Sequence, residues 1–373
     1  MAEERVYQRC TRCVMDTKGD PNIVFDEHGC CNYCTDALEW LDVQKRQAAP
    51  GALKKLFLKI KEDCKNDPYD CLVGVSGGLD SSYLIYLGHQ YGLRMLGVHV
   101  DDGLDTDKAR SNIQKLCTAA HVKLINLEPD PKQYRDLTLS FFKAGVPNLA
   151  IPQDNLILAG LTDATKKYHL KYILHGSNFS MESILQTGNS YTAADSTHIR
   201  AIQKQFSGKP INKLRLLSTF ENSILRHLRK DVIRVTPLNM IDYNFDQAVA
   251  ELGEFCGYEY YGGKHHESVL TRFMQCWYLP EKFGVDKRKS HLSSLIISGQ
   301  MTREKALSRL EQPGYASEEL READMNFLAE YLGISRSEFD AILARPPRSH
   351  DDYPKSLLSN RIIPFLLRHR KIK

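Results

Sequence analysis

Serine, glycine and aspartate side chains crowd into one short stretch of the chain, SGGLDS at residues 76–81. The apolar run at residues 71–75 predicts a strand before it, and apolar residues at helical spacing predict a helix after it. Paired glycines let the backbone approach a ligand closely, and the first amides of a helix favour an anion. Asp80 would repel a bare phosphate, but it can hold a divalent cation that bridges to the anion. We therefore expect Mg²⁺ with a polyphosphate, bound by Ser76, Gly77, Gly78, Asp80, Ser81 and Ser82.

This turn differs from two common nucleotide-binding motifs, because it contains neither GxxxxGKS/T nor GxGxxG. SGGLDS instead resembles the SGGxDS loop of the ATP pyrophosphatase (PP-loop) superfamily, whose members split ATP into AMP and pyrophosphate. The resemblance implies that the polyphosphate is ATP. An ordinary glycine–serine turn that caps a helix is the alternative.

The chain has ten cysteines, and in the cytoplasmic protein that its composition leads us to expect, cysteines favour metal or redox chemistry over disulfides. Cys10, Cys13, Cys31 and Cys34 form two CxxC pairs separated by 17 residues, a spacing that can present four thiolates tetrahedrally to zinc. A site with four protein ligands has no open position, so we expect a structural role. Cys30 is the alternative to Cys31 as third ligand. An iron–sulfur cluster, or a small core of buried thiols without metal, is the alternative to zinc.

Two further polar turns follow predicted strands. Asp101 and Asp102 end the strand at residues 94–100, where carboxylates facing a polyphosphate can hold a metal or position a nucleophile. A solvated turn is the alternative. The turn HGSNFSMES brings Gly176 and Asn178 together, and it is similar to an element that NAD synthetases of the PP-loop superfamily carry beside the nucleotide. A plain helix cap is the alternative for this second turn.

A basic stretch at residues 260–310 contains the segment YYGGKHHES. Lys264 follows a glycine pair there, and lysine suits an exposed phosphate as a mobile point charge. Some PP-loop enzymes supply a cation to the pyrophosphate from a C-terminal segment, which is a role that Lys264 fits. We expect Lys264 to be catalytic together with Asp80 and Asp102. A solvated basic face is the alternative.

Alternating strands and helices must position these turns. Strands are predicted at residues 71–75, 94–100, 123–127 and 171–177, with helices at 40–65, 107–120 and up to 164. This alternation predicts an α/β fold with a doubly wound parallel sheet, in which ligands bind beyond the carboxyl ends of the strands. Residues 291–345 read as helical, with Thr302, Ser317 and Ser335 as helix starts. The expected domains are a zinc knuckle at 1–40, a PP-loop domain at 41–260 and a mostly helical C-terminal region at 261–373.

Composition excludes several classes of protein. The 373 residues hold 50 Lys plus Arg against 46 Asp plus Glu, and a net charge of +4 is too small to indicate nucleic-acid binding. The chain lacks an apolar run of about 18 residues, and its first residues are polar. We expect a cytoplasmic protein that contacts neither nucleic acid nor membrane.

Taken end to end, the chain resembles the WbpG-like N-acetyl sugar amidotransferases of bacterial surface-polysaccharide and nonulosonate synthesis. The resemblance rests on three segments: RCTRCVMDTKGDPNIVFDEHGCCNYC, YDCLVGVSGGLDSSYL and YYGGKHHESVLTRFMQCWYLPEKFGVDKRKSHLSSLI. It implies a PP-loop fold of the adenine nucleotide α-hydrolase type, with ATP, Mg²⁺ and structural zinc. It also implies that ATP activates an N-acetyl amide oxygen and that ammonia then yields an acetamidine. Pyrophosphate would bind at Ser76, Gly77, Gly78, Ser81 and Lys264, Mg²⁺ at Asp80 and Asp101, and the nucleotide-sugar at His265, Glu267, Arg272 and Arg288.

The ammonia for this reaction needs a source. Ala2 follows the initiator methionine, which excludes an N-terminal cysteine nucleophile, and no nucleophile-elbow cysteine lies near suitable partners. The resemblance therefore implies a separate glutaminase like that of histidine biosynthesis, with a cyclase-like companion. A PP-loop tRNA-thiolation enzyme is the alternative enzyme, and a zinc-dependent scaffold protein with a degenerate nucleotide site is the alternative from another class.

Overall fold

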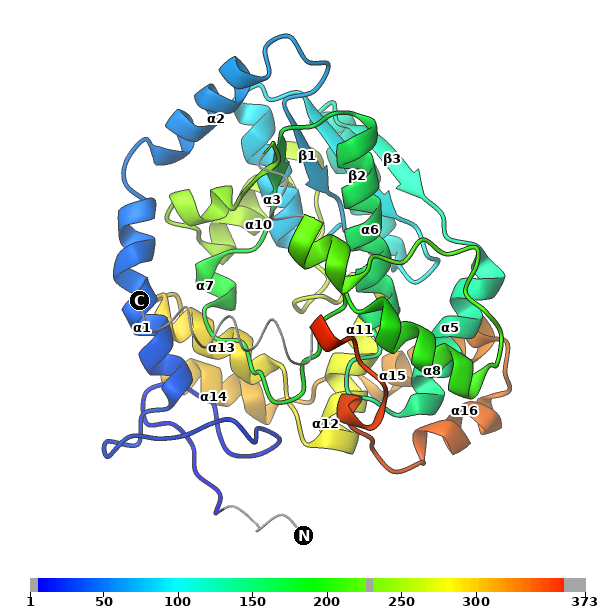
Figure 1. Ribbon diagram of the computed structural model, residues 1–373. Helices are drawn as coiled ribbons and strands as arrows, with labels where there is room; N and C mark the ends of the chain where they lie inside the picture. Colours follow the sequence, from blue (N-terminus) through cyan, green and yellow to red (C-terminus); the bar gives the residue numbers. More distant parts are fainter. Residues whose placement is uncertain (1–5, 226–230, 359–373) are drawn as a thin grey trace.

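The computed structural model describes residues 6–225 and 231–358. Its centre is a five-stranded sheet in the order β3-β2-β1-β4-β5, in which all neighbouring strands run parallel (Figure 1). The chain crosses from β1 to one edge through β2 and β3, and then to the other edge through β4 and β5. The strands are β1 (Cys71–Gly74), β2 (Met95–Val100), β3 (Lys123–Leu127), β4 (Tyr172–Leu174) and β5 (Ile233–Val235).

Helices cover both faces of the sheet, because successive side chains of a strand point to opposite faces and both sets here are apolar. Leu72, Leu96 and Ile173 pack on one face with Ala164 of α6 (Ile151–Lys167). The opposite face packs against α3 (Leu79–Gln90), α4 (Asp107–Ala119) and α10 (Phe245–Cys256). The predicted doubly wound α/β architecture is confirmed.

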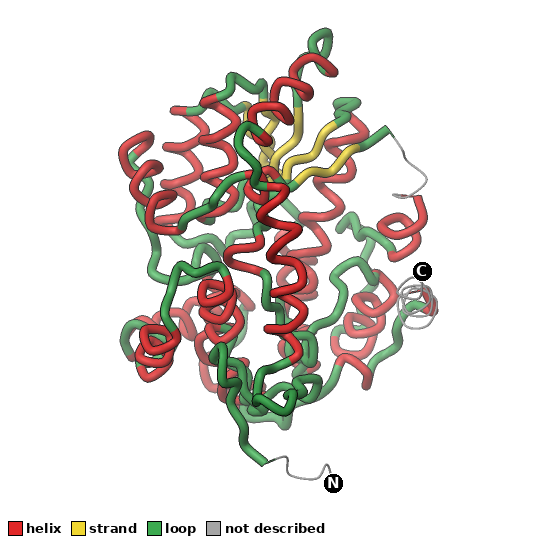
Figure 2. The backbone as a smooth tube through the Cα atoms, turned by 90° about the vertical axis from the view of Figure 1, so that its left-hand side faces the viewer, coloured by secondary structure: helices red, strands yellow, loops and turns green. Residues whose placement is uncertain are grey.

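The remaining helices surround this sheet and build the part of the molecule that holds no strand (Figure 2). Before β5 they are α1 (Asn32–Gln47), α2 (Ala52–Asp63), α5 (Pro131–Ala144), α7 (Phe179–Glu182), α8 (Ser196–Phe206) and the π-helical turn η1 (Glu221–Leu225). After β5 they are η2 (Pro237–Met240), α11 (Val269–Phe273), η3 (Met274–Tyr278), α12 (Leu279–Phe283), α13 (Arg288–Ile297), α14 (Arg303–Glu311), α15 (Glu318–Leu332), α16 (Arg336–Leu343) and η4 (His350–Asp352).

Several predicted boundaries are wrong for local reasons. The helix expected at residues 40–65 is two helices, α1 and α2, because Pro50 precedes Gly51, whose φ of +80° interrupts the helix. The helix expected to end at residue 164 is likewise two helices, and Gly145 with a φ of +66° ends the first. β5 was not predicted, since it is only three residues long and partly exposed.

The C-terminal helices start where the sequence predicts and share a core with the α/β part. Thr302, Ser317 and Ser335 each accept a backbone N–H bond at the start of a helix, which confirms all three caps. Phe142 of α5 lies 5.3 Å from Phe339 of α16 and 6.1 Å from Phe273 of α11, between ring centroids. Residues beyond 261 therefore pack directly against the helices that flank the sheet.

Within the described residues, no helix combines the length and the apolar character that a membrane span requires.

Candidate active site and cysteine cluster

The SGGLDS loop connects the end of β1 to the first turn of α3. Gly77 has a φ of +73°, and a Cβ atom there would lie 2.8 Å from the carbonyl oxygen of Ala109, so only glycine fits. The Ser76 hydroxyl accepts a hydrogen bond from the Gly78 amide at 3.1 Å and lies 3.0 Å from the Ser81 hydroxyl. The loop thus gathers two hydroxyls and the start of a helix at the carboxyl end of the central strand.

A cavity of about 520 Å³ opens beyond the carboxyl ends of the strands. Gly176 of the turn after β4 lies on its wall, where a Cβ atom would come within 3.1 Å of the Ser81 amide nitrogen. The cavity brings together predicted site residues from three distant parts of the sequence: Ser76, Gly78, Asp80, Ser81, Gly176, Lys264, His265 and Glu267. Gly77 does not line the cavity, but its positive φ allows the turn of the loop.

Lys264 joins the C-terminal stretch to the loop. Its ammonium nitrogen lies 2.9 Å from a carboxylate oxygen of Asp80 and 2.9 Å from one of Glu182, and its side chain is only 8% exposed. Burial opposes the charged form, but the two carboxylates outweigh it and raise the pKa of Lys264. The Tyr243 hydroxyl donates to the second oxygen of Asp80 at 2.6 Å.

Besides Gly77 and two arginines, four predicted residues lie outside the cavity wall. Asp102 is buried where it accepts hydrogen bonds from Tyr134 at 2.9 Å and Gln153 at 2.7 Å, and burial raises its pKa to about 6. Asp101 accepts from the Gly103 amide at 3.3 Å, within its own turn. The other two are Ser82 and Asn178. The Ser82 hydroxyl is buried and has no hydrogen-bond partner among the described residues, and the Asn178 side chain accepts a hydrogen bond from the Met181 amide at the start of α7.

The two predicted arginines also point elsewhere. Arg272 binds Asp324 of α15 through two nitrogens, each at 2.7 Å. Arg288 pairs with Asp286 at 2.7 Å and donates to the carbonyl oxygen of Gln312. Both side chains connect C-terminal helices and loops to one another, and neither lines the cavity.

Other cavity residues were not predicted. Asp154 of α6 and Lys287, which precedes α13, line the cavity, and neither makes a side-chain hydrogen bond or ion pair with the described residues. Burial raises the pKa of Asp154 to about 6 and lowers that of Lys287. Tyr261 accepts a hydrogen bond from the Leu79 amide at 3.1 Å. The basic stretch at residues 260–310 gives a sequence signal for Lys287. The sequence gives no comparable signal for Asp154, because an acidic residue in the first turn of a helix is common.

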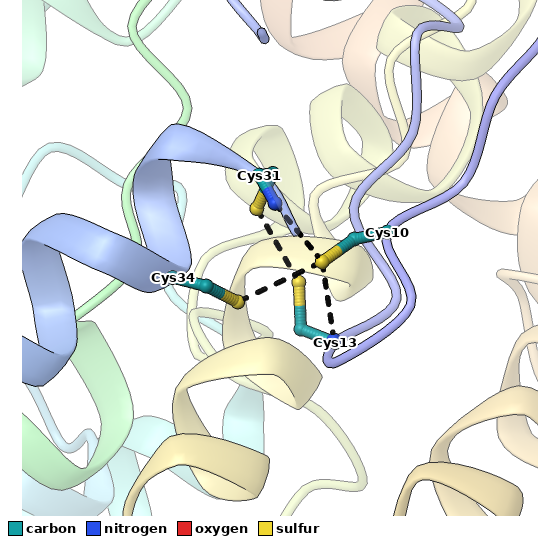
Figure 3. Close-up of side chains that lie close together, drawn as sticks. All are labelled: Cys10, Cys13, Cys31 and Cys34. Atoms are coloured by element: carbon teal, nitrogen blue, oxygen red, sulfur yellow. Dashed lines mark hydrogen bonds between the residues drawn. The ribbon is translucent and has the colours of Figure 1, made fainter. Parts of the chain in front are cut away.

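The four predicted cysteines form one buried cluster (Figure 3). Their sulfur atoms lie within 4.8 Å of one another, with 3.9 Å between Cys10 and Cys34 and 3.7 Å between Cys13 and Cys31. Four sulfurs at about 2.3 Å from a tetrahedral zinc would be about 3.8 Å apart, so the cluster fits this ion. The amides of Cys13 and Cys31 point at the Cys10 sulfur, which suits a thiolate.

Cys30 lies outside the cluster, although it is adjacent to Cys31. Its sulfur contacts the Thr11 hydroxyl at 3.3 Å, and it is not among the four grouped sulfurs. The structure therefore selects Cys31 over Cys30, as the CxxC spacing predicts. The two cysteines face different ways because Cys31 directly precedes α1 and its amide is bound to Cys10.

The cluster packs against the helices that border the cavity. Arg303 of α14 donates to the carbonyl oxygens of Cys13 at 3.1 Å and Cys10 at 3.0 Å. Lys289 of α13 pairs with the buried carboxylate of Asp16 at 2.6 Å. Lys287, at the start of the same helix α13, lines the cavity. The N-terminal segment that carries the cysteines therefore packs against a helix that borders the candidate site.

Comparison with known proteins relates part of the chain to a described family. Residues 267–364 match the family model of the LPS biosynthesis protein WbpG-like, C-terminal domain. No curated protein matches the chain.

Two solved structures show similarity at low sequence identity. NMN synthetase from Francisella tularensis is 13% identical, with a TM-score of 0.36, over 78% of this chain and 94% of that one. NH3-dependent NAD synthetase from Campylobacter jejuni subsp. jejuni NCTC 11168, in complex with the nitrate ion, is 15% identical, with a TM-score of 0.30, over 55% of this chain and 91% of that one.

Proposed function

We propose that the protein is an ATP-dependent ligase that forms AMP and pyrophosphate and converts the N-acetyl group of a nucleotide-activated sugar into an acetamidino group. The observation that carries this proposal is the meeting of Lys264 with Asp80 of the SGGLDS loop inside one cavity. A loop of this sequence is typical of enzymes that release pyrophosphate from ATP. The match of residues 267–364 to a WbpG-like domain supports a role in bacterial surface-polysaccharide (LPS O-antigen) biosynthesis.

The first step activates a poor electrophile. The amide oxygen of the N-acetyl group attacks the α-phosphorus of ATP, the bond to the β-phosphate oxygen breaks, and pyrophosphate leaves. The amide nitrogen loses its proton, so the product is an O-adenylyl imidate. Ser76, Ser81 and Lys264 bind the departing pyrophosphate through hydroxyl and ammonium donors. Asp80 would hold Mg²⁺, which would offset the charge of the polyphosphate.

The second step replaces oxygen with nitrogen. Ammonia attacks the imidate carbon, the bond between that carbon and the AMP oxygen breaks, and AMP leaves with the electron pair. Loss of one proton from the new nitrogen gives the neutral amidine. The cavity volume of about 520 Å³ lies within the usual range for small-molecule sites, and the wall around His265 and Glu267 offers polar groups to the sugar.

The cavity wall favours this reaction over tRNA thiolation, which needs a reactive cysteine beside the ATP site. All ten cysteines lie within the described residues, and none lines the cavity. Cys71 is buried in β1, where burial raises its pKa. The Cys276 sulfur lies 3.3 Å from His266 Nε2, and burial raises the pKa of this thiol to about 12.

The proposal includes zinc and a partner. The cysteine cluster would hold one zinc ion structurally, since its four thiols leave no open position for chemistry. A separate glutaminase like that of histidine biosynthesis, with a cyclase-like companion, would supply the ammonia in the cytoplasm.

One assay tests the reaction directly. Purified protein is incubated with ATP, Mg²⁺, ammonium and a panel of UDP-N-acetyl sugars, and the products are measured by mass spectrometry. We expect AMP and pyrophosphate in equal amounts with one sugar, and the small mass loss that accompanies replacement of oxygen by NH. The Asp80→Asn variant is the matched control and should lose this turnover while it stays folded. Formation of AMP with tRNA and a sulfur donor, and with no sugar, would overturn the proposal.

A further inference from the structure

Five carboxylates line the cavity, and four of them lie within 4 Å of a lysine or histidine nitrogen. Asp80 and Glu182 both bind Lys264 at 2.9 Å. Glu267 lies 3.6 Å from His265 Nδ1, and Asp105 lies 3.0 Å from His99 Nε2. Asp154 has no hydrogen bond or ion pair from its side chain to any described residue. Asp154 is therefore the wall carboxylate with both oxygens unbound, although Glu267 Oε2 is also buried without a hydrogen-bond partner among the described residues.

Asp154 is surrounded by protein although its side chain keeps exposed surface within the cavity. The positive end of the α6 dipole favours a charged aspartate in the first turn. Burial has the larger effect and raises the pKa of this carboxyl group to about 6, with His265 acting weakly in the opposite direction. A carboxylate in this state is charged at neutral pH and is a better proton acceptor than an aspartate on the outer surface of a protein.

Such a group would speed the second step of the proposed reaction, because deprotonation of the new nitrogen prevents ammonia from being expelled again. When ammonia attacks the imidate carbon, the new nitrogen carries a positive charge until it loses a proton. Lys264 is a cation and is held by two carboxylates, so it cannot accept that proton. Asp80 and Glu182 are engaged by Lys264, and the pKa of Glu267 is lowered beside His265 despite its burial.

We propose that Asp154 is a catalytic residue that accepts the proton from the attacking ammonia nitrogen. This inference rests on the proposed function. As the carbon–nitrogen bond forms and AMP leaves with the electron pair of the carbon–oxygen bond, one N–H proton passes to the Asp154 carboxylate. The protonated carboxyl group then returns its proton to solvent through the open cavity.

The experiment separates the two chemical steps in the Asp154→Asn variant. Sugar-dependent exchange of labelled pyrophosphate into ATP reports the first step, and ammonium-dependent AMP release reports the second. We expect exchange to stay within about threefold of wild type and AMP release with ammonium to fall by about a hundredfold or more. Hydroxylamine is largely unprotonated at neutral pH and is a stronger nucleophile, so it should restore AMP release in the variant.

Two controls accompany this variant. Asp163→Asn changes the same type of residue on the same helix, at an exposed position paired with Arg215, and should leave both steps unchanged. Asp154→Ala serves as a second variant without a carboxylate. Both Asp154 variants should melt at or above the wild-type temperature, because the carboxylate makes no bond to the described residues and burial disfavours its charge by more than the helix dipole favours it.

The outcomes distinguish this inference from the function on which it rests. Wild-type protein without sugar-dependent exchange would overturn both. Wild-type exchange together with undiminished ammonium-dependent AMP release in folded Asp154→Asn would overturn the inference alone. Loss of exchange and AMP release together would also overturn it, since Asp154 would then act in binding or activation.

Discussion

The ammonium nitrogen of Lys264 lies 2.9 Å from the Asp80 carboxylate, although 184 residues separate the two in the sequence. Glu182 completes the arrangement at the same distance, so a cation stands between two carboxylates at the mouth of the SGGLDS loop. Lys264 is thereby held in place by protein groups. In the proposed reaction, Mg²⁺ at Asp80 would replace the lysine as the cation beside that carboxylate, and the ammonium group would then be free to bind pyrophosphate.

Replacing Lys264 with methionine should affect both stability and activity. Removal of one member of a buried ion pair leaves Asp80 and Glu182 facing each other, which should lower the free energy of unfolding by about 3 kcal/mol. Sugar-dependent pyrophosphate exchange should fall by about ten- to a hundredfold, because one charge-assisted bond is lost. Chemical denaturation and the exchange assay measure the two effects. Adding Glu182→Gln should recover stability without recovering exchange; recovery of both would assign Lys264 a purely structural role.

Ser76 and Ser82 lie in the same segment but should respond differently to substitution by alanine. The Ser76 hydroxyl lines the cavity, and loss of a hydroxyl donor to a charged acceptor is worth about 1.5–3 kcal/mol, so ATP use should weaken by roughly ten- to a hundredfold. The Ser82 hydroxyl lies outside the cavity wall and has no hydrogen-bond partner in the described part of the chain, so its removal should leave ATP use unchanged. Initial rates at varied ATP concentration measure both. Equal losses would place Ser82 at the nucleotide as well.

Cys13 and Cys30 provide a matched pair for the metal site. Cys13→Ser should remove zinc and most of the folded protein, because the N-terminal segment packs around the four thiols. Cys30→Ser should retain about one zinc per chain, since its sulfur lies outside the cluster. Elemental analysis and visible absorbance decide between zinc and iron–sulfur. Folded, active protein free of metal would contradict the prediction.

Two buried histidines should make stability depend on pH. His350 Nε2 accepts from the Asn148 amide at 3.3 Å, so its Nδ1 carries the proton and donates to His198 Nε2 at 3.1 Å. His198 Nδ1 then donates to the Pro354 carbonyl oxygen at 3.3 Å. Burial lowers the pKa of both rings, that of His350 to about 3. Each ring is therefore neutral in the folded protein, and a proton added to either would face another N–H.

The direction of the effect follows from proton uptake. A histidine in the unfolded chain takes up a proton near pH 6.5, whereas the two histidines in the folded protein stay neutral. The contribution of this pair to the free energy of unfolding is therefore complete above about pH 6.5 and declines as the pH falls toward 3. Thermal melting between pH 8 and pH 4 should show this decline. His350→Gln should melt lower at pH 8 but change less with pH. An identical pH slope in the variant would show that other groups cause the decline.

Glutamine should not serve as nitrogen donor for the purified chain. None of the ten cysteines lines the cavity, and burial raises the pKa of both Cys71 and Cys276. Ammonium salts should support turnover, and a partner glutaminase should add glutamine use. Amidine formation is measured with each nitrogen source. Glutamine-dependent turnover by this chain alone would contradict the expectation.

The sequence by itself determined features that depend on a few neighbouring residues. SGGLDS predicts a tight turn between strand and helix because glycine alone tolerates the φ of Gly77, and that turn is present. The CxxC spacing likewise selects Cys31 over Cys30, since the pairing with Cys34 is local. Parallel strands follow from their alternation with helices, so the polar turns at their carboxyl ends were expected at one edge of the sheet.

Only the tertiary structure decided which charged side chains face the cavity. The segment after residue 260 is rich in cations, yet Lys264 and Lys287 line the cavity while Arg272 and Arg288 bind carboxylates elsewhere. The direction of each side chain is set by helices that are distant in sequence. Asp102 is similarly held by Tyr134 of α5 and Gln153 of α6, whereas Asp154, one residue beyond Gln153, opens into the cavity. The packing of α5 and α6 near the end of β2 determines which of these carboxylates is enclosed and which lines the cavity. The local sequence around Asp102 and Asp154 does not predict this difference.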